Sequence, residues 1–233
     1  MPGHEIVTVD VAATEGWRAA HGGATIGVLE LSGLDNRRSS PRLTERKRAI
    51  EASLRERYHG YARQDFLALP VMADYDRYYK RFNKTYHVQL QLESIVLKGK
   101  PLPDVSPAVD ANFMAEVETL ILTAGHDAQQ LTGPVVIDVS RDDDQMIQMN
   151  GTSRAVRAGD MIMRDAGGVS CSIIYGQDAR SPITPETSRV LYVAYAPTPI
   201  APDIVARQLR GVEENLRLVS EGLVVEQRRL LTA

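Results

Sequence analysis

Short alternating runs fill the second half of the sequence, and the connections between them are brief. Between Gly133 and Ala196 apolar and polar residues alternate, with turns at Asn150-Gly151 and Asp165–Gly168. An Asn-Gly pair suits a tight hairpin, whereas parallel neighbours need a crossover of about a dozen residues or more. The sequence therefore predicts an antiparallel meander. Its strands are expected in PVVIDVS, QMIQM, DMIMRDAGGVSCSIIYG and RVLYVAYA.

The first half has features typical of helices. Ser40 suits an N-cap, Pro41 suits the first helical position, and Gly60 closes that segment. Further helices are expected in ADYDRYYKRFNK, in VQLQLESIVLKGK up to Gly99, and in AVDANFMAEVETLILTAG up to Gly125. Helices followed by antiparallel strands predict an α+β fold, in which the antiparallel meander packs with the helices.

An apolar stripe follows the proline-rich segment APTPIAP and predicts a C-terminal helix. We expect one domain in residues 1–200 and a helical tail in residues 201–233. The stripe suits either a coiled-coil seam in a homodimer or a helix packed on its own domain, and the sequence leaves both open. It consists of Val205, Leu209, Val212, Leu216, Val219 and Leu223.

The composition predicts a full hydrophobic core and argues against a cysteine nucleophile and a zinc site. With 233 residues and 43% hydrophobic composition, the chain is long enough to bury a full core. Its one cysteine, Cys171, lies in the alternating run from Val169 to Ile173, which indicates a small core residue and not a nucleophile. The histidines lack the spacing of a zinc site, so we expect no metal and no cofactor. They are His4, His21, His59, His87 and His126.

The location of the protein is predicted from two absences. The N-terminal MPGHEIVTVD lacks the basic start and apolar core of a signal peptide. No apolar run approaches the ~20 residues of a membrane span. We therefore expect a soluble cytoplasmic protein without a membrane partner.

Positive charge is concentrated in one part of the chain. Residues 35–100 contain 15 Lys and Arg against 8 Asp and Glu, which leaves −10 for the remainder of a chain with net charge −3. A basic surface is the usual footprint of phosphate contact, although a solvated helix face has the same pattern. The candidate RNA contacts are Arg37, Arg38, Arg42, Arg46, Lys47 and Arg48.

Two further clusters each allow a functional and a structural interpretation. Tyr75, Tyr78, Tyr79 and Phe82 could stack on bases, but at helical spacing such residues more often belong to a core. The three adjacent carboxylates of RDDDQ at 141–145 could suit Mg²⁺, but in a turn they more often form a solvated loop. The P-loop, GxGxxG, HExxH and GxSxG motifs are all absent.

Four segments in order resemble the B3/B4 domain of the phenylalanyl-tRNA synthetase β-subunit, and free-standing B3/B4 proteins in particular. They are YDRYYKRF, IVLKGKPLPDVSPAVDANF, MNGTSRAVRAGDMIMRDAGGVSCSI and TPETSRVLYVAY. The resemblance covers roughly Ile26 to Ala196. It implies a β-sandwich-like core of mixed strands with helices outside.

The resemblance also implies tRNA binding and hydrolysis of mischarged aminoacyl-tRNA. An aminoacyl ester is already activated, so a pocket that orients water and the ester carbonyl needs no covalent nucleophile. A small-molecule module that kept the amino-acid pocket and lost the RNA is the alternative, and a dimeric regulatory module is a third hypothesis.

The resemblance implies a set of site residues, by position. Asp178 or Glu186 would bind a substrate ammonium or hold a water, Arg180 would meet a phosphate, and His126 would donate to the ester. Asn112 and Gln177 would line the substrate pocket. Several of these positions also suit plain turns, because Gln177 and Asp178 follow Gly176.

Overall fold

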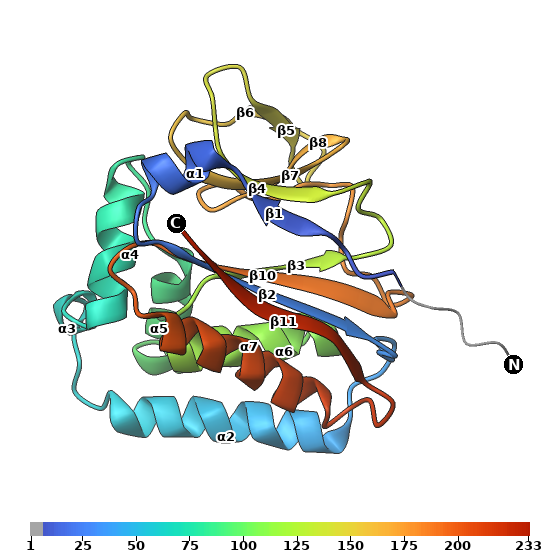
Figure 1. Ribbon diagram of the computed structural model, residues 1–233. Coiled ribbons are helices and arrows are strands. Elements are labelled where there is room, and N and C mark those ends of the chain that lie inside the picture. Colours follow the sequence, from blue (N-terminus) through green and yellow to red (C-terminus); the bar gives the residue numbers. More distant parts are fainter. Residues whose placement is uncertain (1–6) are drawn as a thin grey trace, which may run out of the picture.

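Two β-sheets pack against each other in the computed structural model, which describes residues 7–233 (Figure 1). His4 and the first part of the MPGHEIVTVD stretch lie outside the described residues. One sheet has the order β1-β4-β7-β8-β9 and the other the order β11-β2-β10-β3. In the described part of the chain, no helix has the length and apolarity to cross a membrane. The strands are β1 (Val11–Ala13), β2 (Thr25–Ser32), β3 (Thr123–Asp127), β4 (Val135–Val139), β5 (Gln145–Ile147), β6 (Ser153–Ala155), β7 (Met161–Asp165), β8 (Gly168–Ser172), β9 (Gly176–Gln177), β10 (Arg189–Ala196) and β11 (Val224–Thr232).

Helices cover one face of the second sheet and one end of the molecule. Figure 1 shows α6 and α7 beneath the sheet, α2 beneath them, and α3 to α5 at the side. The helices are α1 (Glu15–Ala20), α2 (Pro41–Arg57), α3 (Arg63–Leu67), α4 (Pro70–Lys80), α5 (His87–Val96), α6 (Pro107–Thr119) and α7 (Pro202–Leu216). This mixed sheet core flanked by helices confirms the predicted fold class.

Local sequence patterns correctly predicted α2 and the antiparallel meander. The Ser40 side chain accepts a hydrogen bond from the backbone N–H of Leu43, and Pro41 begins the helix. Strands β4, β7, β8 and β9 are antiparallel neighbours in the first sheet. The hairpin of β5 and β6 turns at Asn150-Gly151, where Gly151 has a φ of 80°.

The second sheet contains strands that the sequence did not suggest. Strand β2 lies in the half predicted as helical, and all its residues are buried. A strand buried on both faces shows no alternation of apolar and polar residues. Strand β2 pairs with β10 along its whole length, so the centre of this sheet joins the beginning of the chain to residues far along it.

The prediction that one helix runs to Gly125 is wrong. Helix α6 ends at Thr119, and Leu120 takes a left-handed conformation with a φ of 64°. The chain then reverses into β3, where the backbone N–H of Thr123 donates to Glu116 Oε1 at 2.7 Å. A side chain of the helix therefore holds the first residue of the strand that follows.

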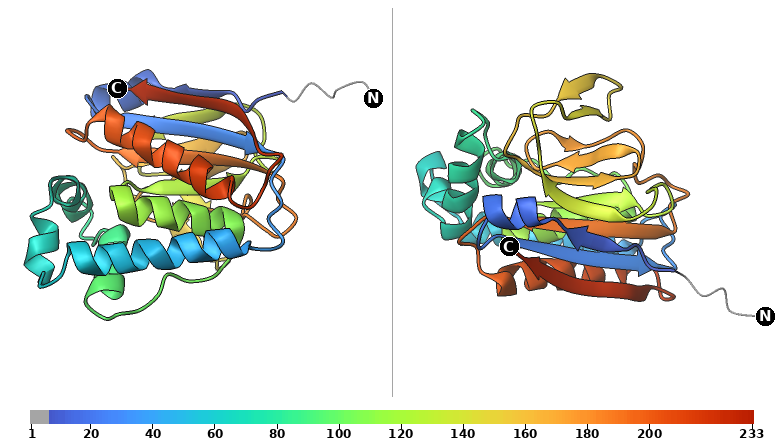
Figure 2. Two further views of the ribbon diagram at one scale, coloured as in Figure 1. Left: turned by 90° about the horizontal axis from the view of Figure 1, so that it is seen from below. Right: turned by 45° about the horizontal axis from the view of Figure 1, so that its top comes forward.

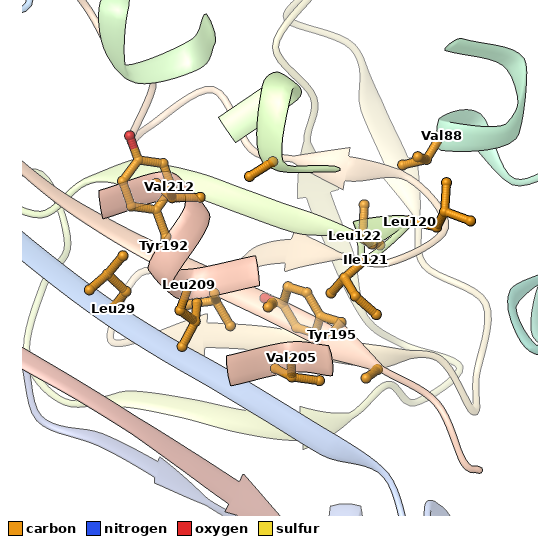
Figure 3. Close-up of a cluster of buried hydrophobic side chains, with 14 of the residues drawn as sticks. Leu29, Val88, Leu120, Ile121, Leu122, Tyr192, Tyr195, Val205, Leu209 and Val212 are labelled. Carbon is orange, nitrogen blue, oxygen red and sulfur yellow. The ribbon is translucent and has the colours of Figure 1, made fainter. Parts of the chain in front are cut away.

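The tail is a helix followed by a strand, so the expectation of helix throughout residues 201–233 is also wrong. Helix α7 ends at Leu216, and β11 then pairs antiparallel with β2. In Figure 3, Val205, Leu209 and Val212 of α7 belong to the buried cluster that also contains Leu29. The stripe therefore packs on its own domain, the second of the two arrangements that its spacing allows.

The aromatic cluster belongs to the core. Tyr75, Tyr78, Tyr79 and Phe82 are all buried. The Tyr75 ring stacks on the Tyr86 ring with centroids 4.1 Å apart. The structure therefore gives these rings the packing role and leaves none of them on the surface for bases.

Candidate functional site

A half-open cavity of about 330 Å³ lies where α5, α6, β3, the β8–β9 turn and β10 meet. Most of its wall is apolar, and a few polar side chains reach it. Such a combination is typical of small-molecule sites, in which the polar groups orient the ligand. The lining residues are His87, Val105, Ala108, Val109, Asn112, Phe113, Leu122, Thr123, Ala124, Gly125, Met149, Cys171, Ser172, Ile173, Gly176, Gln177, Ile183, Tyr192 and Tyr195.

Two of the expected site residues, Asn112 and Gln177, line this cavity. Asn112 Nδ2 donates to the Thr123 carbonyl at 2.8 Å, which ties α6 to β3. Gln177 Nε2 donates to the Ser181 carbonyl at 2.5 Å. Within residues 7–233 Gln177 Oε1 accepts no hydrogen bond, so it remains available to a ligand.

His126 lies behind Gln177 and does not line the cavity. Its ring is fully buried, with Nδ1 2.8 Å from Ser181 Oγ and 3.2 Å from Gln177 Nε2. Burial lowers the pKa of His126 to about 3, so the ring is neutral at physiological pH. Its ring therefore lies against Gln177 and Ser181, away from the cavity lining.

Asp178 and Arg180 form an ion pair with each other, and each also contacts another side chain of the protein. Arg180 Nε donates to Asp178 Oδ2 at 2.5 Å, and Arg180 Nη1 donates to Asp165 Oδ1 at 2.8 Å. Asp178 is 1% exposed and also accepts from the Ser181 hydroxyl. Neither residue lines the cavity, and Glu186 is exposed on the loop before β10, also away from the lining. Through the contact of Arg180 with Asp165, the loop before β10 is tied to strand β7 of the first sheet.

Among the polar residues of the cavity that sequence reasoning missed are His87 and Tyr195. The Tyr79 hydroxyl donates to the Ile173 carbonyl at 2.8 Å and lies 3.3 Å from His87 Nδ1. Because that hydroxyl proton is already engaged, His87 Nδ1 must be the donor, which leaves Nε2 as an acceptor. The Tyr195 hydroxyl is buried without a hydrogen-bond partner in the described chain.

The cysteine in the cavity wall is a thiol. Cys171 is 2% exposed, and burial raises its pKa to about 12. A thiol in this state is a poor nucleophile, as expected from its position in an alternating run.

The basic candidates on and before α2 differ from one another. Arg37, Arg38 and Arg42 are exposed and form no ion pair within the described residues. Arg46 donates to Glu118 at 3.2 Å, and Arg48 Nη2 lies 3.1 Å from Asp104 Oδ2. The first three side chains therefore carry the uncompensated charge.

Lys47 is a core residue, which corrects its prediction as an RNA contact. It is 1% exposed, and its Nζ donates to Asp110 at 2.6 Å, to Asp104 at 2.7 Å and to the Pro103 carbonyl at 2.8 Å. With three partners and no exposed surface, Lys47 holds the segment before α6 and cannot reach a phosphate.

The carboxylates of RDDDQ form a turn before β5. Asp144 pairs with Arg164 at 3.0 Å. Among residues 7–233 no group of three His, Cys, Asp or Glu side chains is arranged to hold a metal ion.

Two comparisons with known proteins found a match, one to a family and one to a solved structure. The family model described as the B3/4 domain matches residues 74–220. A solved structure, an N-terminal fragment of the phenylalanyl-tRNA synthetase β-subunit from Pyrococcus horikoshii, is similar over 100% of the chain with a TM-score of 0.50 and 8% identity. The chain spans 57% of that fragment, and this likeness shows the fold alone. No curated protein sequence matches.

Proposed function

Since the chain belongs to the B3/4 domain family, we propose that it binds tRNA and hydrolyses amino acids wrongly attached to it, in trans. The observation that carries this proposal is the cavity of about 330 Å³. That volume is at the small end of ligand pockets and suits one amino acid. The apolar wall, which includes Phe113, Ile183 and Tyr192, would take an aromatic or branched aliphatic side chain.

The polar groups of the cavity suit hydrolysis by an oriented water. In this proposal Gln177 Oε1 accepts a hydrogen bond from the substrate ammonium, and His87 Nε2 takes a proton from the attacking water. The water oxygen bonds to the ester carbonyl carbon, and the bond from that carbon to the ribose oxygen breaks. His87 then returns the proton to the ribose oxygen, so the products are a free amino acid and an uncharged tRNA.

In this proposal the exposed basic residues at and before the start of α2 contact the RNA. Arg37 borders a surface hollow that also includes Val105, and Val105 lines the cavity as well. The exposed guanidinium groups of Arg37, Arg38 and Arg42 would contact phosphates beside the mouth of the cavity.

A second candidate function is the binding of a free amino acid without RNA. It is favoured by the ion pairs of Arg46, Lys47 and Arg48, which reduce the net positive charge of α2. This function predicts that free aromatic or aliphatic amino acids bind with little dependence on salt, and calorimetric titration measures that.

Release of amino acid from a panel of mischarged tRNAs tests the proposal. The native protein should hydrolyse at least one pair, and His87→Asn should lower the rate by about 10²-fold or more. The exposed His59 offers a matched control, and His59→Asn should hydrolyse like the native protein. An absence of hydrolysis across the panel, or equal rates in both variants, would contradict the proposal.

A further inference from the structure

A polar groove lies between α2, α6 and α7, apart from the cavity. Seen from below in Figure 2 (left), these three helices lie side by side, with α6 in the middle. The groove has a volume of about 360 Å³, and four arginines and two glutamates line it. Its floor is the C-terminal half of α6, whereas the cavity uses the N-terminal half. The charged lining residues are Arg46, Arg57, Glu118, Arg207, Arg210 and Glu214.

Positive charge exceeds negative charge in the groove. Arg57, Arg207 and Arg210 are exposed, and within residues 7–233 none of them forms an ion pair or a side-chain hydrogen bond. Arg46 is the exception, because it donates to Glu118. Four arginines against two glutamates leave an excess of two positive charges.

The packing of the helices brings these arginines to one rim. Gly211 of α7 faces Ala115 of α6, and a Cβ at Gly211 would lie 3.4 Å from that of Ala115. Because these two residues are small, the bottom of the groove is not filled by side chains, and the longer arginine side chains line its edges. Arg207 and Arg210 are three residues apart and share a helix face.

The span of the groove favours an extended anion over a single small one. Arg46 and Arg57 are eleven residues apart on α2 and project on the same face, about 16 Å from each other along the helix axis. One phosphate cannot contact both, whereas a strand with several phosphates can. Guanidinium groups bind phosphate oxygens through paired hydrogen bonds.

We propose that this groove binds phosphate groups, and that its ligand is the backbone of an RNA strand. The groove is a second contact surface, formed by residues outside both the cavity and the basic segment of Arg37 to Arg42. The RNA part of this inference rests on the proposed function, whereas the phosphate chemistry rests on the groove alone.

Binding of labelled bulk tRNA at several salt concentrations tests the inference. Arg207→Glu/Arg210→Glu should weaken binding at least tenfold and reduce the slope of log K against log salt by about 1.4 to 1.8, because each lost phosphate contact removes about 0.7 to 0.9. Lys98 and Lys100 are exposed outside the groove, so Lys98→Glu/Lys100→Glu is a charge-matched control that should bind within twofold of the native protein.

A titration with pyrophosphate separates binding of a small phosphate anion from binding of an RNA backbone. If the native chain binds tRNA and the arginine variant binds it equally well, the groove is refuted while the proposed function stands. If the native chain binds no tRNA but binds pyrophosphate, and the variant does not, the phosphate site stands and the proposed function fails. Binding of neither probe would overturn both.

Discussion

Replacing Glu116 by glutamine should change the stability of the protein in a way that depends on pH. Relative to the native protein, the variant should gain unfolding free energy as the pH rises from acid to neutral. Glu116 is 2% exposed, and its Oε1 accepts a hydrogen bond from the Thr123 backbone. Burial raises its pKa from 4.5 to about 8. Glutamine keeps the acceptor oxygen and the shape of the side chain but has no proton to lose.

The sign and the size follow from the difference between folded and unfolded states. Below pH 4.5 the carboxyl group is protonated in both states; as the pH rises from 4.5 toward 8, only the unfolded chain loses the proton. The free energy of unfolding contributed by Glu116 therefore falls by about 1.4 kcal/mol per pH unit, or about 3 kcal/mol between pH 4.5 and pH 7. This loss of stability with rising pH is absent in Glu116→Gln.

Urea unfolding at pH 4.5, 5.5, 6.5 and 7.5 measures the effect. The difference in unfolding free energy between Glu116→Gln and the native protein should shift in favour of the variant by about 3 kcal/mol from the lowest pH to neutrality. Glu45 is exposed on α2, and Glu45→Gln reports the effect of removing a surface carboxylate. A difference that stays constant with pH would refute the assignment of Glu116 as a protonated buried acid.

Three further predictions concern the core. Lys47→Ala leaves Asp110 buried without its cation, so the unfolding free energy should fall by about 3 to 5 kcal/mol; a change below about 1 kcal/mol would contradict the buried ion pair. Gly27→Ala places a Cβ 2.7 Å from Val205 Cγ1, so it should lower the thermal midpoint by several degrees, at a cost of about 1 to 3 kcal/mol. Cys171 is buried with a raised pKa, so a thiol reagent at pH 8 should label it only after unfolding, and fast labelling of the native protein would contradict that.

The elements that were predicted correctly depend on neighbouring residues. Ser40 and Pro41 specify the start of α2 within one turn of the helix, and Asn150-Gly151 specifies a hairpin by its own backbone preference. The missed strands depend on partners far along the chain. Strand β11 pairs with β2 across most of the sequence, and such pairing leaves little local pattern.

The candidate site was predicted in part for a similar reason. The resemblance placed Asn112 and Gln177, which line the cavity, together with His126, Asp178 and Glu186, which do not. Sequence position alone cannot tell a side chain that faces a cavity from one that lies behind it. His87 begins α5 and reaches the cavity only through the packing of that helix, and it has no motif around it.

The most direct test of the account compares binding of charged and uncharged tRNA, with an amide-linked aminoacyl-tRNA that cannot be hydrolysed. Native protein should bind the charged form more tightly when the amino acid is aromatic or branched aliphatic. A Cβ at Gly125 would lie 2.8 Å from Ile183 Cδ1 and 3.0 Å from Tyr192 Cε1 in the cavity wall, so Gly125→Ala should abolish this preference and leave binding of uncharged tRNA unchanged. Equal affinity of the native protein for both forms would contradict the claim that the cavity receives the amino acid.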